Sequence, residues 1–267
     1  MAGENITFEK MDGVGIITLN RPESRNALTL EMVAEIGEAI EACRKPDVRA
    51  VLLTGAGGGF CSGADLKVVV ETMGSGGQEA LQEYIRALAG ELHTKVVLGL
   101  RRLEKPVVAG INGVAAGAGF SLMLGCDMRV AANGARFLMA YANIGAPADG
   151  GSTYLLPRLV GAGRAMELYL ASQPTGSQAA LEMGLVSQVV ADDELHRHAM
   201  ETAVRLARGP TLAYARVKAL FASSWENDLT TQLDAETEAF ADMSLTADFQ
   251  EGIKAFTERR QARFQGK

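Results

Sequence analysis

Cysteine is scarce in this chain. It has three cysteines, Cys43, Cys61 and Cys126, among 267 residues. An odd number without a CxxC pair favours a reducing compartment over a disulfide framework. The opening residues, MAGENITFEK, also lack the basic segment and the apolar core of a secretion signal. We therefore expect a cytoplasmic protein.

Basic residues are in the minority. The chain contains 26 Lys and Arg against 32 Asp and Glu, which gives a formal net charge of -6. A surface that binds nucleic acid needs a basic face to neutralise phosphates, and the composition indicates none. We expect no nucleic-acid partner, although a locally basic pocket for an anion stays compatible with the total charge.

Long apolar runs are limited to one segment, Val107–Cys126. Its length would be about sufficient to span a bilayer. The Asn112-Gly113 pair is typical of a turn that divides the run, and charged residues flank it at Lys105 and Asp127. The run therefore predicts a strand, a turn and a short buried helix, and we expect no membrane partner.

Several familiar site motifs are absent. The segment GAGGGF has Phe60 where the dinucleotide fingerprint needs its last glycine. The sequence contains neither a P-loop nor the GxSxG elbow of serine hydrolases. His196 and His198 are two residues apart on a predicted helix, so they face different directions and cannot share a metal ion. We expect no cofactor and no metal site.

The order of predicted elements indicates an α/β protein. Alternating apolar and polar residues about Asp12-Gly13 predict a hairpin, and strand-like segments then alternate with helical ones. Residues 72–77, TMGSGG, are typical of a mobile surface insertion and precede a long predicted helix over residues 78–103. From about residue 163 onward the pattern is nearly all helical.

Two glycine-flanked turns carry the main functional signal. Residues 59–66, GFCSGADL, and residues 113–121, GVAAGAGFS, each follow a predicted buried strand and lead toward a helix. Small residues let a ligand approach the backbone, and free N–H groups at a helix start can stabilise a developing negative charge. Tight packing of helix on strand would also explain the glycines of either turn alone. Both turns together favour an oxyanion hole.

These turns and further motifs resemble the crotonase superfamily, the enoyl-CoA hydratases and isomerases. The resemblance runs through NRPESRNAL, GFCSGADLK, KPVVAGINGVAAGAG, RFLMAYANIG and EGIKAFTERR. It implies a crotonase-like ββα spiral core over residues 1–200, a helical trimerisation region over residues 201–267, and assembly as a homotrimer or as a hexamer of two trimers. It also implies that the peptide N–H groups of Ala64 and Ala118 polarise an acyl-CoA thioester.

The acid-base residues depart from the hydratase pattern. Family hydratases hold the reacting water with two glutamates, and the resemblance places Ser121 and Tyr141 at those positions. Neither residue is an ordinary carboxylate base at neutral pH. The next carboxylate is Asp149, in PADGGSTYLLPR, which aligns with the aspartate of double-bond isomerases, especially those of the phenylacetate pathway. From residue type alone, Asp149 would instead be a helix N-cap.

The resemblance also indicates how the substrate would be held. The expected substrate contacts are, in chain order, Ser24, Arg25, Ala27, Ala64, Asp65, Leu66, Lys67, Gly117, Tyr141, Phe256 and Arg259. The first three would lie beside the nucleotide end of coenzyme A, with Lys67 close to the same ligand. Phe256 and Arg259 match positions that reach the coenzyme A of a neighbouring subunit. For each charged residue, a solvated surface position is the alternative interpretation.

These residues favour a cofactor-free enoyl-CoA isomerase in which Asp149 shuttles a proton. Tyr141 in place of a glutamate favours a medium-chain or ring-containing acyl group. Three alternatives stay open: a hydratase with a degenerate glutamate pair, an enzyme like the aromatic acyl-CoA dehalogenases, and a non-catalytic scaffold that binds acyl-CoA or RNA. The dehalogenase resemblance needs a histidine base at Thr94, and His93 is one residue out of register. The sequence does not determine the acyl group, the pathway, or whether the assembly is a trimer or a hexamer.

Overall fold

The computed structural model describes residues 3–267 and begins with a hairpin. Strand β1 (Ile6–Met11) pairs antiparallel with β2 (Val14–Leu19). Asp12 and Gly13 join the two strands with φ angles of 52° and 77°. Both angles lie in the left-handed region that a two-residue type I′ turn requires. The predicted hairpin is confirmed.

A sheet of six strands forms the centre of the core. Its order is β1-β2-β3-β5-β7-β10, and every neighbouring pair from β2 onward is parallel. The four strands after the hairpin are β3 (Ala50–Gly55), β5 (Val107–Ile111), β7 (Met128–Ala132) and β10 (Gln188–Val190). β5 is buried along its whole length. Burial on both faces explains its continuous apolar sequence, VVAGI.

A second sheet has the order β4-β6-β8-β9. Its short strands are β4 (Gly59–Cys61), β6 (Val114–Ala116), β8 (Arg136–Leu138) and β9 (Thr175–Gly176). The chain passes from the six-stranded sheet to this one and then into a helix three times: β3, β4 and α2 (Leu66–Glu91); β5, β6 and α4 (Ala118–Leu124); β7, β8 and α5 (Ser152–Val160). This repeated order confirms the predicted α/β class and ββα spiral. It also makes β4 and β6 parallel neighbours.

The apolar run Val107–Cys126 is divided as the sequence predicts. It contains β5, the turn at Asn112, β6 and the fully buried α4. The Asn112 side-chain amide donates to the carbonyl oxygens of Gly55 and Gly57, each at 2.8 Å, which fixes the turn against the neighbouring loop. Within residues 3–267, no helix has both the length and the apolar composition needed to cross a membrane.

Further short and medium helices cover the sheets. They are η1 (Pro22–Ser24), α1 (Leu30–Ala42), η2 (Leu92–Val97), α3 (Leu98–Arg102), η3 (Ala140–Ile144), α6 (Ala162–Ala171), α7 (Ser177–Glu182) and η4 (Asp192–Glu194). α1 begins after Thr29, whose Oγ1 accepts from the Met32 N–H at 3.3 Å and so satisfies one orphan donor of the helix start. The buried face of α1 packs against β1, α2 and η2.

The glycine-containing segment 72–77 does not form a separate insertion. Residues 72–76 are helical, whereas Gly77, with φ 71° and ψ −161°, departs from helical geometry and divides α2 into two segments. Because Gly77 interrupts α2, the predicted start of the long helix at residue 78 is confirmed, and only the predicted loop over residues 72–76 is wrong. The physical reason is the cap: Asp65 Oδ1 accepts from the Lys67 N–H at 3.1 Å and starts the helix before the glycines. The helix then continues through η2 and α3 to Arg102.

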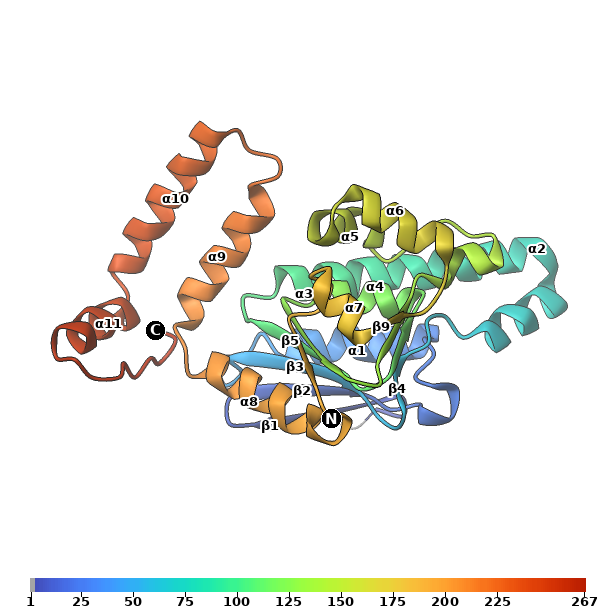
Figure 1. The fold of residues 1–267 in the computed structure, drawn as a ribbon, viewed down its shortest axis with the longest axis horizontal. Helices are drawn as coiled ribbons and strands as arrows, with labels where there is room; N and C mark the ends of the chain where they lie inside the picture. Colours follow the sequence, from blue (N-terminus) through green and yellow to red (C-terminus); the bar gives the residue numbers. More distant parts are fainter. Residues whose placement is uncertain (1–2) are drawn as a thin grey trace.

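The last four helices divide between the core and an arm. α8 (Leu195–Ala207) packs against β3, β5 and β7 through buried residues that include Ala199 and Ala203. The predicted boundary at residue 200 thus falls inside a helix that belongs to the core. The helices α9 (Thr211–Ser223), α10 (Leu229–Ser244) and α11 (Ala247–Thr257) follow, and Figure 1 shows them standing away from the sheets as a C-terminal arm.

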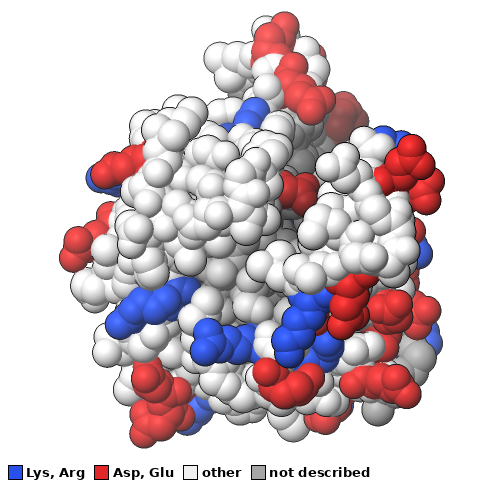
Figure 2. Space-filling view, turned by 90° about the vertical axis from the view of Figure 1, so that its right-hand side faces the viewer, with Lys and Arg blue, Asp and Glu red and all other residues white. Residues whose placement is uncertain are grey.

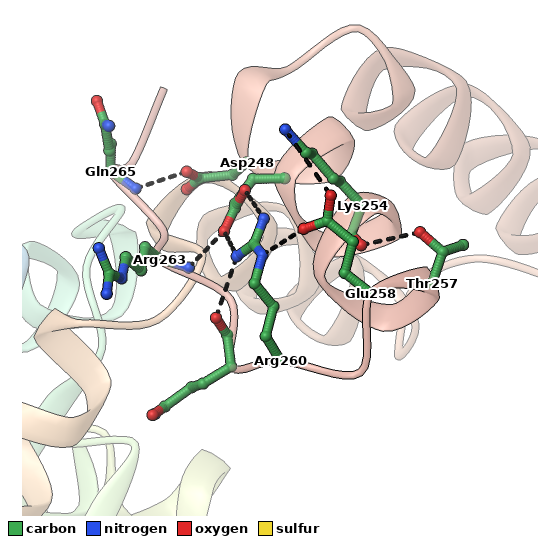
Figure 3. A network of polar contacts seen from close by, with 9 residues as sticks. Asp248, Lys254, Thr257, Glu258, Arg260, Arg263 and Gln265 are labelled. Atoms are coloured by element: carbon green, nitrogen blue, oxygen red, sulfur yellow. Dashed lines mark hydrogen bonds and ion pairs between the residues drawn. The ribbon is translucent and has the colours of Figure 1, made fainter.

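Polar contacts tie the end of the chain to the arm (Figure 3). The Arg260 guanidinium donates to both carboxylate oxygens of Glu251, at 2.6 and 2.8 Å, and these bonds lower the pKa of Glu251 to about 2. The Asp248 carboxylate accepts from the backbone N–H groups of Gln265 and Gly266, at 2.6 and 2.8 Å. The final residues therefore fold back onto α11.

Candidate active site

The two glycine-flanked turns of the sequence meet at the ends of β4 and β6. Gly63 has a φ of 98°, and a Cβ atom there would lie 2.9 Å from the Ala116 carbonyl oxygen and 3.3 Å from the Ala118 nitrogen. A Cβ atom at Gly119 would overlap the Cys61 carbonyl oxygen. Glycine is therefore required at both positions, because any side chain would push the two turns apart.

Each turn presents a main-chain N–H that secondary structure does not use. The Leu28 N–H donates to the Gly63 carbonyl at 2.7 Å, and the Asp65 N–H donates to the Leu28 carbonyl at 2.9 Å. Since peptide groups alternate along a strand, the N–H of Ala64 points away from Leu28. Ala118 is the first residue of α4, so its N–H has no acceptor within the helix. Two such donors can stabilise an oxyanion.

A single cavity of about 410 Å³ joins these donors to a carboxylate. Its size falls in the range of small-molecule sites, and most of its lining is apolar. Six of the residues predicted from the sequence line it: Ala64, Leu66, Gly117, Ala118, Tyr141 and Asp149. Among the lining residues that the structure describes, Asp149 is the only one with a carboxylate. The cavity therefore combines two main-chain N–H donors with one acid-base group.

Hydroxyl groups hold the main chain of Asp149. Ser121 Oγ and Ser152 Oγ each donate to the Asp149 carbonyl oxygen at 2.7 Å. The Tyr141 hydroxyl lies 2.8 Å from Ser121 Oγ and 3.2 Å from the same carbonyl. Because each hydroxyl carries one proton, all three are satisfied when Tyr141 donates to Ser121. Ser121 and Tyr141, which the resemblance places at the hydratase glutamate positions, thus fix the backbone of the aspartate.

The pair Ser121 and Tyr141 carries no charge at neutral pH. Ser121 is fully buried, and Tyr141 is 8% exposed. Burial raises the pKa of the Tyr141 hydroxyl well above its ordinary value, and the hydrogen bond with Ser121 only partly opposes this. Tyr141 is therefore a neutral hydrogen-bond donor. These positions do not supply the two carboxylates by which hydratases hold water.

The side chain of Asp149 does not cap a helix. The residue that precedes α5 is Gly151, and no side-chain cap bond is made there. Gly150 and Gly151 have φ angles of 62° and 78°, so they carry the sharp turn that separates the aspartate from the helix. The N-cap interpretation of Asp149 is wrong, because two left-handed residues stand between its carboxylate and the helix start.

The structure brings His93 into contact with Asp149, although the sequence shows this histidine one residue out of register with the expected base position. His93 Nε2 lies 2.5 Å from Asp149 Oδ1. His93 belongs to η2, a π-helical segment whose turns contain an additional residue. A residue that is one position out of register in the sequence can therefore still point toward Asp149. The sequence pattern contains no sign of this segment, and the only signal is that His93 is one residue from Thr94, where the resemblance to the dehalogenases needs a histidine base.

The residues expected beside the nucleotide form a loop against one edge of the cavity. The Ser62 N–H donates to the Arg25 carbonyl at 3.0 Å, and Ser62 Oγ donates to the Ser24 carbonyl at 3.1 Å. Ser62 also lines the cavity. Ala27 is buried, whereas Arg25 and Lys67 are exposed. The structure thus brings this loop to the cavity edge, although none of its three predicted residues lines the cavity.

Asp65 has a local structural task. One of its oxygens pairs with Arg21 Nη1 at 3.0 Å, and the other caps α2. The same Arg21 nitrogen also donates to the Ala27 carbonyl, so the ion pair joins the two loops that flank the cavity. Asp65 is 6% exposed. Its carboxylate shapes the turn that presents Ala64.

Phe256 and Arg259 lie in a different part of the molecule. Phe256 belongs to α11 and is 84% exposed, and Arg259 follows the end of that helix. Neither residue lines the cavity of its own chain. Figure 1 shows the C-terminal arm and the outer end of α2 at opposite ends of the molecule.

The face of the molecule that carries α2 has basic as well as acidic side chains (Figure 2). Figure 2 faces the end of the molecule that carries α2 and shows Lys and Arg side chains in a row beneath a broad uncharged area. Local basic groups therefore exist on this face despite the acidic total charge.

Within residues 3–267, no group of three His, Cys, Asp or Glu side chains is arranged to hold a metal ion.

Comparison with known proteins agrees with this architecture. The sequence profile described as Enoyl-CoA hydratase/isomerase matches residues 9–267. The chain is 39% identical over 257 residues to the 1,2-epoxyphenylacetyl-CoA isomerase of Escherichia coli, with 96% of each chain covered. It is 34% identical over 266 residues to the crotonyl-CoA hydratase of Syntrophomonas wolfei, with 99% of each covered.

A solved structure gives the same result. The enoyl-CoA hydratase of Bacillus anthracis superposes with a TM-score of 0.90 at 33% identity, over 99% of this chain and 100% of that chain. Hydratases and isomerases therefore both occur among the relatives, so similarity alone does not separate the two activities. The matched profile, the identities and the ββα spiral together show that the chain belongs to the enoyl-CoA hydratase/isomerase family, within the crotonase superfamily.

Proposed function

We propose that this protein is an enoyl-CoA isomerase that moves a double bond without a cofactor. The thioester oxygen of the substrate would accept hydrogen bonds from the Ala64 and Ala118 N–H groups. This polarisation acidifies the carbon-bound protons of the allylic system. The Asp149 carboxylate would remove a proton from one carbon, leaving a conjugated enolate, and return a proton to the carbon at the other end. The double bond shifts, and Asp149 ends in its starting state.

One observation carries this proposal: among the described residues 3–267, Asp149 is the single carboxylate lining a cavity that also contains both main-chain donors. A proton shuttle needs one acid-base group beside a stabilised enolate. The paired-carboxylate route of hydration needs two, and Ser121 and Tyr141 occupy those places as neutral hydroxyls. The resemblance of this chain to an epoxyphenylacetyl-CoA isomerase is consistent with this distinction.

The lining favours an apolar acyl group. Leu66, Ile85, Leu88 and Leu92 contribute aliphatic surface, and Tyr141 contributes an aromatic wall. A chain of medium length or a ring would remove this surface from water. We infer that unsaturated acyl-CoA thioesters with such groups are the preferred substrates and that hydration is weak.

Coenzyme A would lie along the Ser24–Ala27 loop, with Lys67 near its phosphates. Phe256 and Arg259 would complete that site from a neighbouring subunit of a homotrimer or of a hexamer. Large exposed apolar side chains on the arm support such an assembly, among them Phe221, Leu229, Phe240 and Leu245. Sedimentation of the full chain would measure the assembly. The cytoplasmic location expected from the sequence stays a prediction.

A second reaction class gains support from His93. In a mechanism like that of the aromatic acyl-CoA dehalogenases, Asp149 would attack the substrate and a histidine would activate the water that releases it. The contact between His93 Nε2 and Asp149 Oδ1 supplies such a neighbour. A single-turnover reaction that traps an ester on Asp149 would favour this class. An isomerase forms no such ester.

The test of the proposal is Asp149→Asn. The amide keeps the volume of the side chain but cannot accept a proton from carbon. We expect kcat for isomerisation of a 3-enoyl-CoA to fall about 100- to 10,000-fold. KM should change little, because the two N–H donors remain. The matched control is Asp47→Asn, an exposed aspartate that pairs with Lys10. A wild-type rate in Asp149→Asn would contradict the assignment of Asp149.

A different result would indicate a scaffold that is not an enzyme. In that case the unaltered protein would bind acyl-CoA without exchanging a proton at any carbon of the substrate.

A further inference from the structure

His93 contacts both the candidate acid-base group and bulk water. Its Nε2 is 2.5 Å from Asp149 Oδ1, which is hydrogen-bond distance, so a proton can pass directly between the two groups. The His93 side chain is 44% exposed. A neutral imidazole accepts a proton at one nitrogen while the other can release one, so it can transfer protons between two partners.

The position of His93 relative to the cavity matters as much as the contact. Leu88, Ala89 and Leu92 line the cavity, but His93, the next residue along the chain, lies outside the lining. Asp149 does line it, and its side chain is 36% exposed. An acyl group that fills the cavity would cover the aspartate from that side. The imidazole would keep its contact with water.

From this arrangement we propose that His93 is a proton relay: it exchanges the proton held by Asp149 with solvent while substrate occupies the cavity. The step is a balanced transfer, in which Asp149 passes its proton to one ring nitrogen and the other ring nitrogen releases a proton to water. Deuterium enters by the reverse route. The inference rests on the proposed function, since it takes Asp149 as the group that carries the substrate proton.

A purely orienting role for His93 makes a different prediction. A histidine that only holds the carboxylate in place could be replaced by any side chain that donates a hydrogen bond from the same point. Glutamine offers an amide N–H there but cannot carry a proton onward. His93→Gln therefore separates the two roles, and the measured quantity must report proton exchange as distinct from turnover.

The experiment is isomerisation of a 3-enoyl-CoA in deuterated water, with product deuterium per turnover measured by mass spectrometry at low conversion. For the unaltered protein we expect extensive incorporation. For His93→Gln we expect continued isomerisation, an unchanged KM, and a several-fold lower deuterium content, because the original proton is returned. The ratio is counted per turnover, so a lower fraction of folded protein does not affect it.

Two further arms complete the test. His196→Gln removes an exposed histidine from α8 and should leave the deuterium content unchanged. Added imidazole should restore deuterium incorporation to His93→Ala, since it replaces the lost relay from solution. Equal deuterium content in the products of His93→Gln and of the unaltered protein would overturn the relay. So would a failure of imidazole to restore deuterium incorporation in His93→Ala. Full retention of the original proton in the unaltered protein would overturn it as well.

These outcomes are distinct from a failure of the proposed function. If Asp149→Asn isomerises at the wild-type rate, Asp149 is not the shuttle and the relay has no role to serve. If Asp149→Asn is inactive while His93→Gln exchanges normally, the shuttle stands and only the relay is wrong.

Discussion

The two walls of the cavity are made in different ways. The main-chain wall, which contains Gly63, Ala64, Gly117 and Ala118, presents backbone N–H groups and needs glycine for close approach of the two turns. The Asp149 wall presents a carboxylate whose backbone is held by serine and tyrosine hydroxyls and whose side chain contacts His93. The first wall depends on backbone geometry and the second on side-chain identity. Under the proposed function, activation of the thioester would be shared among relatives, and the Asp149 wall would decide which reaction follows.

Apart from replacement of Asp149 itself, the largest effect is expected from disturbing the main-chain wall. In Gly119→Ala, the added methyl group overlaps the Cys61 carbonyl, so the start of α4 must shift and carry the Ala118 N–H with it. Loss of one such donor lowers kcat by about 100- to 1,000-fold. Steady-state kinetics with a 3-enoyl-CoA measures this effect.

Gly90→Ala is the matched control for that substitution. It lies in α2, where an added Cβ atom has no neighbour within 4 Å. Activity should be unchanged, and stability should rise slightly because alanine favours a helix over glycine. Equal activity of Gly119→Ala and Gly90→Ala would show that the position of the Ala118 N–H is not important for the reaction.

A smaller effect is expected from loosening the Asp149 wall. Ser121→Ala removes a hydrogen bond to the Asp149 carbonyl and leaves the buried Tyr141 hydroxyl without its 2.8 Å partner. Loss of a buried bond of this kind costs about 1–3 kcal/mol of folding free energy. We expect kcat to fall about tenfold, which corresponds to about 1.4 kcal/mol. Urea unfolding and kinetics measure the two quantities.

Ser152→Ala gives the comparison for Ser121. Ser152 Oγ donates to the same carbonyl at the same distance of 2.7 Å. The Tyr141 hydroxyl, however, contacts Ser121 and not Ser152. Both single variants and the double variant form a mutant cycle. A larger loss in Ser121→Ala than in Ser152→Ala supports the hydroxyl network. Full activity in the double variant would show that the carbonyl of Asp149 needs no support from hydroxyls.

The main-chain wall could be predicted from the sequence, and the Asp149 wall only in part. Glycines after buried strands indicate two turns with free N–H groups, and the resemblance to the crotonase superfamily assigns these donors to Ala64 and Ala118. The side of the helix on which His93 lies depends on the π-helical segment Leu92–Val97, which no periodicity of the sequence reveals. In the same way, residues 72–76 have loop composition but are helical because the cap at Asp65 starts a helix before them, and only Gly77 interrupts it.

The role of an individual carboxylate was harder to predict than its presence. Asp65 and Asp149 both precede a helix. Asp65 caps α2 and pairs with Arg21, whereas two left-handed glycines keep the Asp149 carboxylate off α5. Residue type and position do not distinguish these cases, since the difference depends on the backbone conformation that follows.

The smallest effect is expected outside both walls. Lys67→Glu reverses an exposed charge at the start of α2, next to the Ala64 turn. If Lys67 attracts the phosphates of coenzyme A equally in the ground state and the transition state, KM rises a few-fold and kcat is unchanged. Lys45→Glu, at an exposed lysine after α1, is the control. A selective fall in kcat would place Lys67 in the chemistry rather than in binding.

The measurement that most directly tests the difference between the walls is the product distribution of the unaltered protein. Crotonyl-CoA, a medium-chain 3-enoyl-CoA and a ring-containing unsaturated acyl-CoA are each incubated in deuterated water, and the products are identified by mass spectrometry and NMR. With one carboxylate beside two main-chain donors, the account predicts positional isomerisation of the 3-enoyl or ring substrate and little addition of water to crotonyl-CoA. Rapid net hydration of crotonyl-CoA with little movement of the double bond would contradict it.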